Sequence, residues 1–491
     1  MKVLIVGGGS REHAITDAFY RSVYEPVIYA ISSNANPGIL RICKKTGGEL
    51  IKGNINDPMF VADMAEKLSV DLVFIGPEEP LFHGVPDELE HRGVPVIGLN
   101  SKASEIEKSK AFMRRLMWKY KIPGRLRFKA FKSIEDALAY IEEYAESVAI
   151  KPARQAGGKG VKVIADIQAY LKKVKEEVKK KHAERIYSQI MARYRDIEDK
   201  ILIEEKVEGP EYTIQCITDG ESVLPFPPVQ DNKHAFEMEM GPETGGMGSI
   251  SGRGNILPFI TEEEYKESVK IIEGVVKALR KEVNQDFRGV ISGQMMLTMI
   301  WGPTIIEFYA RFGDPEAVNV LPLLETDMID ICEAILSRKL HKVKLKFRDK
   351  ATVVKAIAPR GYPNRRDLAK GHPLIIDEKK IKELGGRVFY GSVNLVNGKM
   401  LTGGSRAVEI YAEGESIEKA AEIAEKCVRY VRTADGWALF HRSDIGSPIS
   451  LKRMIELAEL VRSVYTYRKS RGILGKYIDW IPGRGKIVYE S

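Results

Sequence analysis

The sequence predicts a multi-domain α/β protein, α+β in its overall arrangement, with a doubly wound parallel sheet at its N-terminus. Two observations predict this class. The chain has 491 residues, which is too long for one hydrophobic core and indicates about three domains. Short apolar runs alternate with helix-like segments over residues 1–100, and this alternation is typical of βαβ units.

The N-terminal sheet is predicted from four apolar runs, each followed by Gly, Pro, Asn or Ser. These strand candidates are Val3–Val6, Val27–Ile31, Leu72–Ile75 and Val94–Ile97. Parallel sheets bind ligands where their strands end. We therefore expect ligand contacts in the loops that follow, which are Gly7–His13, Ser33–Gly38 and Gly76–Leu81.

Two further α/β regions follow along the chain. The first is expected to hold a helix from Ser104 to about Lys121 and strands at Val148–Lys151 and Ile201–Glu205. Its residues 172–200 are highly charged, which favours a solvated helix or helical hairpin over a nucleic-acid arm. The second, from about residue 330, predicts strands Ala351–Ile357 and Val388–Val396, a helix at 416–433, and a basic tail with an amphipathic helix, Leu451–Val464.

Composition excludes several classes of protein. An apolar content of 44% and a charged content of 29% are those of a soluble globular protein. No run of about 18 apolar residues exists, and the first run continues into Gly7–Gly9 as a strand would, so we expect a cytoplasmic protein with no membrane partner. The four cysteines lie far apart, which favours reduced thiols over a disulfide or zinc site.

The positive charge is concentrated in the tail. Residues 449–491 hold nine Lys or Arg against four Asp or Glu, a net +5, so the other residues contribute only +3 of the total of +8. A phosphate-handling enzyme also needs local positive potential. No nucleic-acid partner is therefore expected.

Two glycine-rich segments are candidates for phosphate binding. The turn Gly7–His13 lies between a strand and a helix, where amides approach a phosphate; the competing dinucleotide fingerprint lacks its third glycine, because Glu12 stands there. The second segment follows strand residue Lys151 and spans Gln155–Gly160. A lysine and free amides there suit ATP phosphates, although a plain hairpin turn with a surface lysine is the alternative.

The strongest block of residues predicts a metal site. Two strands joined near Gly302 would place Gln294 and Glu307 side by side, and such oxygen ligands suit Mg²⁺ shared with phosphates. Arg311 would face the same side and neutralise charge on a transferring phosphoryl group, or else form a structural salt bridge. The polar loops 230–234 and 241–248 predict a mobile substrate loop, with a passive loop as the alternative.

Taken together, these segments resemble the glycinamide ribonucleotide synthetase family of the ATP-grasp superfamily, over about residues 1–447. The matching stretches are GGGSREHA, GPEEPL, SKAF, IKPARQAGGKGV, IEEKVEGPE, QDNKHAF, GPETGGMGS, IEFYARFGDPE and HRSDIG. The resemblance implies an N-terminal domain (1–103), a two-lobed ATP-grasp domain (104–330) with a mobile lid lobe (about 123–205), a C-terminal domain (331–447) and a basic extension (448–491).

The resemblance also implies roles for individual residues. The expected ATP-binding residues are Lys110, Lys151, Gly157, Gly158, Lys159, Gly160, Glu204, Glu205, Val207 and Glu211. The expected substrate-binding residues are Gly8, Arg11, Glu12, His13, Asn36, Pro37, Gly38, Glu78, Asp231, Thr244, Gly245, Gly246 and Arg311. Lys151 and Arg311 are the expected catalytic residues, and Gln294 and Glu307 the expected metal ligands. Where the family has an Asn ligand, this chain has Tyr309, a poor ligand for Mg²⁺.

The implied activity is ligation of glycine to 5-phosphoribosylamine with ATP and Mg²⁺ or Mn²⁺, through glycyl phosphate, in purine biosynthesis. A monomer or homodimer is expected. One rival is another ATP-grasp ligase, such as a purine-pathway carboxylase or a formate-using transformylase. The other is a regulatory or nucleic-acid-binding protein that acts through the tail; deleting residues 449–491 would abolish the function of such a binder and leave a ligase measurably active.

Overall fold

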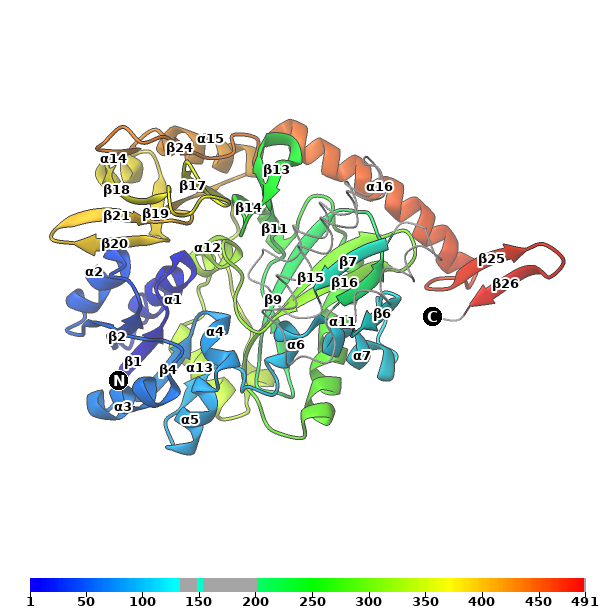
Figure 1. The fold of residues 1–491 in the computed structure, drawn as a ribbon, viewed down its shortest axis with the longest axis horizontal. Helices are drawn as coiled ribbons and strands as arrows, with labels where there is room; N and C mark the ends of the chain where they lie inside the picture. Colours follow the sequence, from blue (N-terminus) through cyan, green and yellow to red (C-terminus); the bar gives the residue numbers. More distant parts are fainter. Residues whose placement is uncertain (133–147, 153–200, 490–491) are drawn as a thin grey trace.

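The N-terminal part is a five-stranded parallel sheet in a computed structural model that describes residues 1–132, 148–152 and 201–489 (Figure 1). The strand order is β3-β2-β1-β4-β5. Its elements are β1 (Lys2–Val6), α1 (Ser10–Tyr20), β2 (Val27–Ser32), α2 (Pro37–Lys45), β3 (Leu50–Lys52), α3 (Pro58–Leu68), β4 (Leu72–Ile75), α4 (Glu78–Phe82), α5 (Val85–His91) and β5 (Val96–Ile97).

Helices cover both faces of this sheet, as the doubly wound prediction requires. Val3 and Ile5 of β1 belong to one buried cluster with residues of α1 and α2. Leu4 and Val6 belong to another with residues of α3 and α5. Because successive side chains of a strand point to opposite faces, an unbroken apolar run is buried only if helices pack on both faces of the sheet. The predicted fold class is confirmed.

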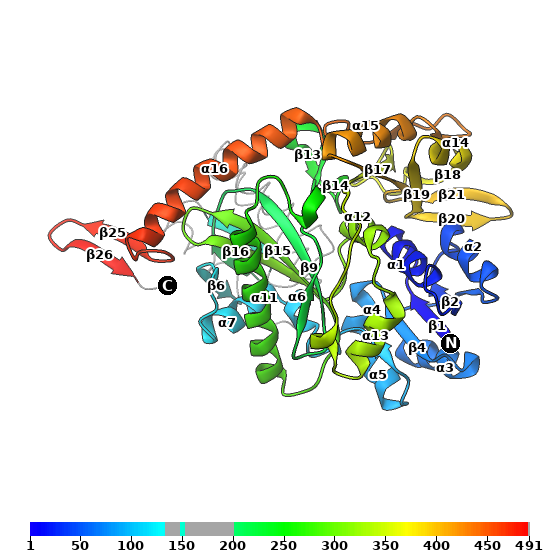
Figure 2. The same cartoon turned by 180° about the vertical axis from the view of Figure 1, so that it is seen from behind.

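An antiparallel sheet, β10-β9-β15-β16, forms the centre of the molecule. Helix α11 lies along one of its faces (Figure 2). The elements of this region are α6 (Glu105–Lys108), α7 (Lys110–Lys119), β9 (Glu211–Thr218), β10 (Val223–Pro225), α11 (Glu262–Val283), β15 (Gly289–Thr298), β16 (Gly302–Tyr309), α12 (Glu316–Val320), η3 (Leu321–Leu323), α13 (Met328–Leu336) and η4 (Leu340–Lys342).

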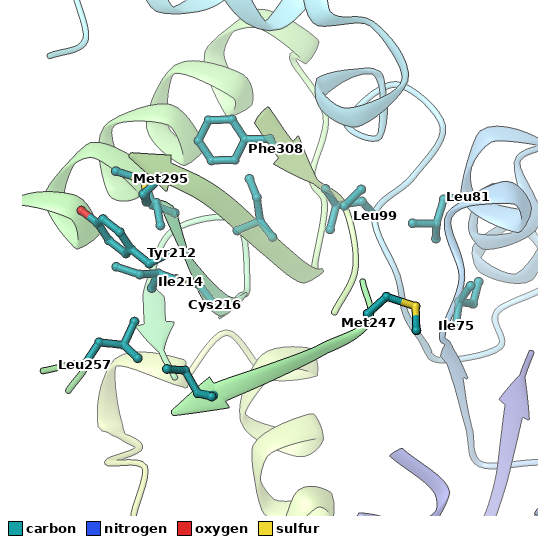
Figure 3. Packing of buried hydrophobic residues seen from close by; sticks show 14 of the residues in the cluster. Ile75, Leu81, Leu99, Tyr212, Ile214, Cys216, Met247, Leu257, Met295 and Phe308 are labelled. Carbon is teal, nitrogen blue, oxygen red and sulfur yellow. The ribbon is translucent and has the colours of Figure 1, made fainter. Parts of the chain in front are cut away.

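The core of the central sheet continues into the N-terminal part. Figure 3 shows Tyr212, Ile214 and Cys216 of β9 beside Met295 of β15 and Phe308 of β16. The same buried cluster extends through Leu99 to Leu81 and Ile75. Shared apolar packing of this kind fixes the two parts against each other, because separating them would expose that surface to water.

A second, smaller sheet has the order β6-β8-β7, from strands β6 (Phe128–Phe131), β7 (Val148–Pro152) and β8 (Ile201–Glu205). Arg114 of α7 ties it to the central sheet. Its Nε donates to Glu204 Oε1 at 2.5 Å, and its two terminal nitrogens donate to the carbonyls of Ile305 and Ile306 at 2.8 and 3.0 Å. The Arg114 side chain is fully buried.

The predicted single helix from Ser104 to Lys121 is wrong, because the structure has two helices, α6 and α7. Ser109 between them is extended, and its hydroxyl accepts a hydrogen bond from the amide of Phe112 at 3.1 Å. Serine competes for backbone amides and so starts a helix better than it continues one. Lys110 therefore becomes the first residue of α7.

The C-terminal part contains two antiparallel sheets, β11-β14-β17-β22-β19 with β24 beside β17, and β20-β21-β18-β23. A two-stranded ribbon, β12-β13, lies next to them. The elements are β11 (Gln230–Asp231), β12 (His234–Phe236), η1 (Glu237–Glu239), β13 (Met240–Glu243), β14 (Gly248–Ser251), η2 (Arg253–Asn255), β17 (Ala351–Pro359), β18 (Lys370–Ile376), α14 (Glu378–Glu383), β19 (Gly386–Tyr390), β20 (Val393–Val396), β21 (Lys399–Gly403), β22 (Val408–Gly414), α15 (Ile417–Val428), β23 (Val431–Thr433) and β24 (Leu439–Phe440).

Two predicted elements of this part are wrong. The strand predicted at Val388–Val396 is two strands of different sheets, because the chain turns at Gly391, which lies against the backbone of Arg406. The helix predicted at 416–433 ends at Val428, and Val431–Thr433 pairs with β18 instead. Sheet pairing overrides the helical pattern there, since propensity is only a weak prior.

The helix in the basic tail is longer than the predicted Leu451–Val464. Helix α16 spans Pro448–Ser470, and strands β25 (Tyr477–Ile481) and β26 (Gly485–Tyr489) form a hairpin after it. Within the described ranges, no helix has the length and apolar character needed to cross a membrane.

His13 joins the N-terminal part to the C-terminal part. Its Nδ1 accepts a hydrogen bond from the amide of Tyr390 at 3.0 Å, and its ring packs against that of Phe389 at 5.2 Å. Burial lowers the pKa of His13 to about 4. The imidazole is therefore neutral near pH 7.

We expect Arg114→Met to lower the free energy of unfolding by about 3 kcal/mol, because it removes the guanidinium from one buried carboxylate and two buried carbonyl oxygens. The matched control is Arg115→Met, since Arg115 is the exposed neighbour on the same helix. Urea unfolding followed by tryptophan fluorescence measures both. Equal unfolding midpoints for the two variants would contradict the structural role of Arg114.

A second prediction concerns acid stability. An unfolded histidine binds a proton near pH 6.5 but folded His13 does not until about pH 4, so stability falls as the pH decreases through this window. We expect His13 to account for a loss of about 2–3 kcal/mol on going from pH 7 to pH 4. Urea unfolding at several pH values should show a shallower slope for His13→Gln and an unchanged slope for His83→Gln, an exposed control.

Candidate active site

A cleft of about 730 Å³ lies where the three parts meet. Its walls include the first residues of α4 in the N-terminal part, strands of the central sheet and residues of the C-terminal part. Eight residues selected from the sequence line it: Glu78, Lys110, Glu211, Asp231, Thr244, Gly245, Glu307 and Arg311. Residues far apart in the chain therefore converge on one cavity, as expected of a binding site.

Lys110 and Glu307 form a partly buried pair at one wall. Lys110 begins α7, and its Nζ donates a short hydrogen bond to Glu307 Oε1. Glu307 lies on β16 directly opposite Gln294 of β15. The predicted pairing of these two strands is confirmed. The pair places a cation and a carboxylate together before any ligand binds.

A second charged pair lies beside the first. Lys233 Nζ and Gln294 Nε2 both donate to Glu211 Oε2, at 3.3 and 2.9 Å. Burial lowers the pKa of Lys233, but the carboxylates of Glu211 and Glu307 more than offset this, and the pKa lies well above its ordinary value. Lys233 therefore stays protonated and adds a permanent positive charge to the cleft.

Arg311 is held on three sides. It donates to Glu78 at 3.2 Å and pairs with Glu107 at 3.2 Å. Its guanidinium lies over the ring of Tyr309, 4.4 Å from the ring centre. Two carboxylates and an aromatic face leave the cation little freedom, which suits a group that must neutralise a specific oxygen.

Tyr309 occupies the position where the resembling family has an Asn ligand. Its hydroxyl donates to Glu307 Oε2 at 3.4 Å. Burial raises the pKa of this phenol, so it remains neutral. Tyr309 therefore orients the Glu307 carboxylate by a hydrogen bond and offers no charge to a metal ion.

Asp231 is the one charged group of the cleft with an unsatisfied atom in the part of the chain that the structure describes. Its Oδ1 is buried and lacks a hydrogen-bond partner there. Burial and then the nearby Glu316 raise the pKa of Asp231 well above its usual range. A buried acceptor without a donor is costly. The position is therefore suited to a ligand that brings a donor, and a cationic one best of all.

The turn Thr244–Gly246 lies against Asp231. Gly246 has a φ of +101°, and a Cβ there would lie 2.5 Å from Asp231 Oδ1. Only glycine combines that backbone angle with such a close approach. Arg406 donates to the carbonyls of Gly245 and Gly246 at 2.7 and 3.0 Å, so the C-terminal part holds the turn in place.

The N-terminal candidates lie behind the cleft and do not line it. They are Gly8, Arg11, Glu12, His13, Asn36, Pro37 and Gly38. Glu12 accepts from the Gly9 amide at 2.6 Å, and Asn36 accepts from the Gly38 amide at 2.9 Å and donates to the Gly8 carbonyl at 3.0 Å. Arg11 lies 3.7 Å from Glu78, which does line the cleft. Their role in substrate binding stays a prediction.

Three ATP-binding candidates lie on or after β8. The Glu204 carboxylate pairs with Arg114, and the Glu205 carboxylate accepts from Tyr477. Both carboxylates are thus engaged within the protein, and the ATP-binding role of the segment that includes Val207 stays a prediction. Lys151 lies on β7 opposite Leu202. Gly157, Gly158, Lys159 and Gly160 lie outside the described residues.

The sequence alone did not single out four residues of the site. Lys233 is inside a matching motif, and its charge was a usable signal. Glu316 is the last residue of the motif that contains Arg311, and it accepts a hydrogen bond from the Thr213 hydroxyl at 3.1 Å. Tyr362, whose hydroxyl accepts from the Gly245 amide at 2.9 Å, and Arg406 come from the C-terminal part and carry no local signal.

The donor set fits a hard divalent cation bound together with a ligand. Among the described residues, no group of three or more His, Cys, Asp or Glu side chains could hold a metal ion unaided. The carboxylates of Glu211 and Glu307 face the cleft. Gln294 lies on β15 between their strands but does not line the cleft, and its Oε1 accepts a hydrogen bond from the Thr213 hydroxyl at 2.8 Å. Mg²⁺ commonly takes one or two carboxylates and completes its shell with phosphate oxygens and water.

Comparison with known proteins agrees with this geometry. Sequence profiles of phosphoribosylglycinamide synthetase match along the chain: its N domain at residues 1–107, its ATP-grasp (A) domain at 108–317 and its C domain at 352–448. The phosphoribosylamine–glycine ligase of Methanobrevibacter smithii is 42% identical over 456 residues, which are 93% of this chain and 98% of that protein. The ligase of Methanopyrus kandleri is 42% identical over 464 residues, or 94% and 99%.

Solved structures with the same fold include two enzymes. The phosphoribosylamine–glycine ligase of Thermotoga maritima has a TM-score of 0.70 at 23% identity and covers 91% of this chain and all (100%) of its own. The biotin carboxylase domain of the 2-oxoglutarate carboxylase from Hydrogenobacter thermophilus has a TM-score of 0.65 at 15% identity and covers 97% and 99%. At these identities the likeness concerns the fold alone.

Proposed function

The chain belongs to the phosphoribosylglycinamide synthetase family, and from this premise we propose that its cleft joins glycine to 5-phosphoribosylamine, coupled to cleavage of ATP to ADP and phosphate. The reaction is an ATP-dependent carbon–nitrogen ligation of purine biosynthesis, and the chain is an ATP-grasp ligase. The family profiles match residues 1–317 and 352–448.

The observation that carries the proposal is the unsatisfied carboxylate of Asp231 in a cleft rich in fixed cations. Glycine has an ammonium group that would supply the missing donor to Asp231. Its carboxylate, at the other end, would then face Arg311 and Lys233, which both line the same cavity.

The first step proposed is phosphoryl transfer. A carboxylate oxygen of glycine attacks the γ-phosphorus of ATP, the bond to the bridging oxygen breaks, and ADP leaves with the electron pair. Lys110, Lys233 and Arg311 stabilise the charge that spreads over the phosphoryl oxygens. No side-chain nucleophile is required, because positioning and charge neutralisation supply the acceleration.

The second step proposed is amide formation from glycyl phosphate. The amine of 5-phosphoribosylamine attacks the acyl carbon, the carbon–oxygen bond to phosphate breaks, and the nitrogen loses a proton. The products are glycinamide ribonucleotide and inorganic phosphate. We propose that the turn Gly8–His13 and Asn36–Gly38 hold the ribose phosphate from the N-terminal side.

A divalent cation would be held by Glu307 and Gln294, with Glu211 close by. Mg²⁺ or Mn²⁺ in this position would neutralise the nucleotide phosphates and orient the γ-phosphoryl group. The protein's own contribution is the orientation of the ligands: Tyr309 holds one oxygen of Glu307 and Lys110 holds the other. We further propose a cytoplasmic enzyme that works as a monomer or homodimer.

The rival ATP-grasp ligases share the nucleotide features but act on other substrates. The match to the N and C domains of one family, outside the shared ATP-grasp domain, favours glycine and phosphoribosylamine. The rival that binds through its basic tail is disfavoured because buried residues of the tail pack against the central sheet.

We expect ADP release to require both glycine and freshly generated phosphoribosylamine, each omitted in turn. Asp231→Asn should raise the KM for glycine by about tenfold to 100-fold, since a hydrogen bond to a charged group contributes about 1.5–3 kcal/mol, and should leave the KM for ATP within about twofold. Glu243→Gln, a change at another acidic residue of the cleft, is the matched control. ADP release that is unaffected by the absence of glycine would overturn the substrate assignment.

The same assay has a pH dependence with a definite sign. The ammonium binds only to the ionised carboxylate, and the pKa of Asp231 is raised. The KM for glycine should therefore increase as the pH falls through that raised pKa, at a higher pH than an ordinary aspartate would show. The increase should be absent in Asp231→Asn.

We expect Glu307→Gln to lower kcat by at least about 100-fold and to raise the Mg²⁺ concentration needed for half-maximal rate, because one charged ligand and the partner of Lys110 are lost. Chelation should abolish wild-type turnover, and Mg²⁺ or Mn²⁺ should restore it. Glu79→Gln, at an exposed residue of the cleft, is the control. Near-normal turnover of Glu307→Gln with an intact fold would remove Glu307 from the chemistry.

A further inference from the structure

The C-terminal extension lies beyond the part of the chain that the family profiles match. The last profile ends at residue 448, where α16 begins. Figures 1 and 2 show α16 running along one side of the molecule to the hairpin β25-β26. Its first turns line the cleft through Ser450, Leu451, Arg453 and Met454. The extension therefore begins at the active site.

The middle of the extension is anchored to the central sheet. Arg462 pairs with Glu264 at 2.8 Å, and the Tyr465 hydroxyl donates to the same carboxylate at 2.6 Å. Glu264 caps the N-terminus of α11 and is buried. The ring of Tyr465 lies on Gly302, the first residue of β16. A buried charge with several donors is a rigid attachment, because breaking any one of them leaves the carboxylate short of partners.

The next anchor is the turn between β15 and β16. The Gly475 amide donates to the carbonyl of Ile300 at 2.9 Å. Gly475 has a φ of +70°, and its Cα lies so close to the Trp301 ring that a Cβ would overlap it. The start of the hairpin is thus fixed to the same strands that carry Gln294 and Glu307.

The end of the extension reaches the other sheet. The Tyr477 hydroxyl donates short hydrogen bonds to both carboxylate oxygens of Glu205, the last residue of β8. The Arg127 guanidinium lies over the Tyr477 ring, 3.3 Å from its centre, and the Arg127 amide donates to Glu205 Oε1 at 3.0 Å. Tyr477 therefore connects the central sheet, through the extension, to the sheet β6-β8-β7.

Glu205 lies directly before a segment that leads into the cleft. After β8 the chain passes to Gly209 and Glu211, which both line the cleft. The segment between is the one whose main chain is assigned to the nucleotide. A tether at Glu205 limits how far this segment can shift relative to the cations and metal ligands of the central sheet, and small misplacements of a bound substrate cost reaction rate.

We propose that Tyr477 is a positioning residue for ATP, because it fixes the nucleotide-binding segment after β8 to the central sheet through the C-terminal extension. The inference rests on the proposed function, which assigns ATP to that segment. Tyr477 itself does not line the cleft, so it acts through Glu205 and not by contact with the reacting atoms.

The test uses Tyr477→Phe in the full-length chain, which removes the hydroxyl and keeps the ring beneath Arg127. Tyr467→Phe, at an exposed tyrosine on α16, is the matched control. We expect the Kd for ADP, measured by calorimetry, and the KM for ATP to rise about three- to tenfold, which is less than the effect of losing a direct hydrogen bond to a charged group, because Tyr477 acts on the nucleotide only through Glu205. The KM for glycine should stay within about twofold, and the control should match the wild type.

Glu205→Gln provides the reciprocal variant. We expect it to weaken ADP binding similarly, and the double variant to bind ADP no more weakly than the weaker single variant, because both changes remove the same contact. An unchanged Kd for ADP in Tyr477→Phe would overturn the proposal even if the melting temperature fell. An equal rise in the KM for glycine would also overturn it, since that indicates general loosening.

The two proposals fail in different ways. If the wild-type protein binds ADP but releases none from ATP with glycine and phosphoribosylamine, the proposed function fails, and ADP calorimetry on Tyr477→Phe still decides the role of the tether. If the wild-type protein binds no ADP, both proposals are overturned.

Discussion

The arrangement of this protein depends on buried ion pairs at the junction of its three parts. Arg406 of the C-terminal part pairs with Asp314 at 3.1 Å, and the Ser10 hydroxyl of the N-terminal part donates to Asp314 at 3.1 Å. Arg311 pairs across to Glu78 of the N-terminal part at 3.2 Å. Buried charges are costly unless every partner is present. The parts therefore stabilise the segment from Tyr309 to Glu316 only when all are assembled, and that segment forms one wall of the cleft.

Because of this junction, the charged side chains of the cleft are already positioned when no ligand is bound. Lys110 with Glu307, and Lys233 with Glu211, are neutral pairs that a nucleotide and its metal ion can rearrange with little net change of charge. Asp231 differs, since one of its oxygens has no partner within the described residues. The two lysine–carboxylate pairs suit the phosphates of a nucleotide. The carboxylate of Asp231, with its unsatisfied oxygen, suits the ammonium group of an amino acid. A rigid polar site of this kind stabilises charge without having to reorganise during the reaction.

The extension after residue 448 adds a connection beyond the part of the chain that the family profiles match. It begins at the cleft and ends on β8, so it spans the two sheets between which the nucleotide is expected. A helix of this length, about 34 Å at 1.5 Å per residue, is stiff enough to hold that distance. Its basic charge is explained in part by pairs with the acidic residues of α11, such as Arg462 with Glu264 and Lys469 with Glu267.

The sequence by itself determined the fold class, the parallel N-terminal sheet and the pairing of Gln294 with Glu307, because apolar periodicity and short turns act over neighbouring residues. It also singled out eight of the residues that line the cleft, Asp231 and Arg311 among them, because they lie in recognisable motifs. Only the tertiary structure decided that Arg406 holds the turn Thr244–Gly246, that Tyr309 orients Glu307, and that the tail reaches Glu205. Those contacts join residues far apart in the chain, and no local pattern encodes them; their geometry exists only once the sheets have packed.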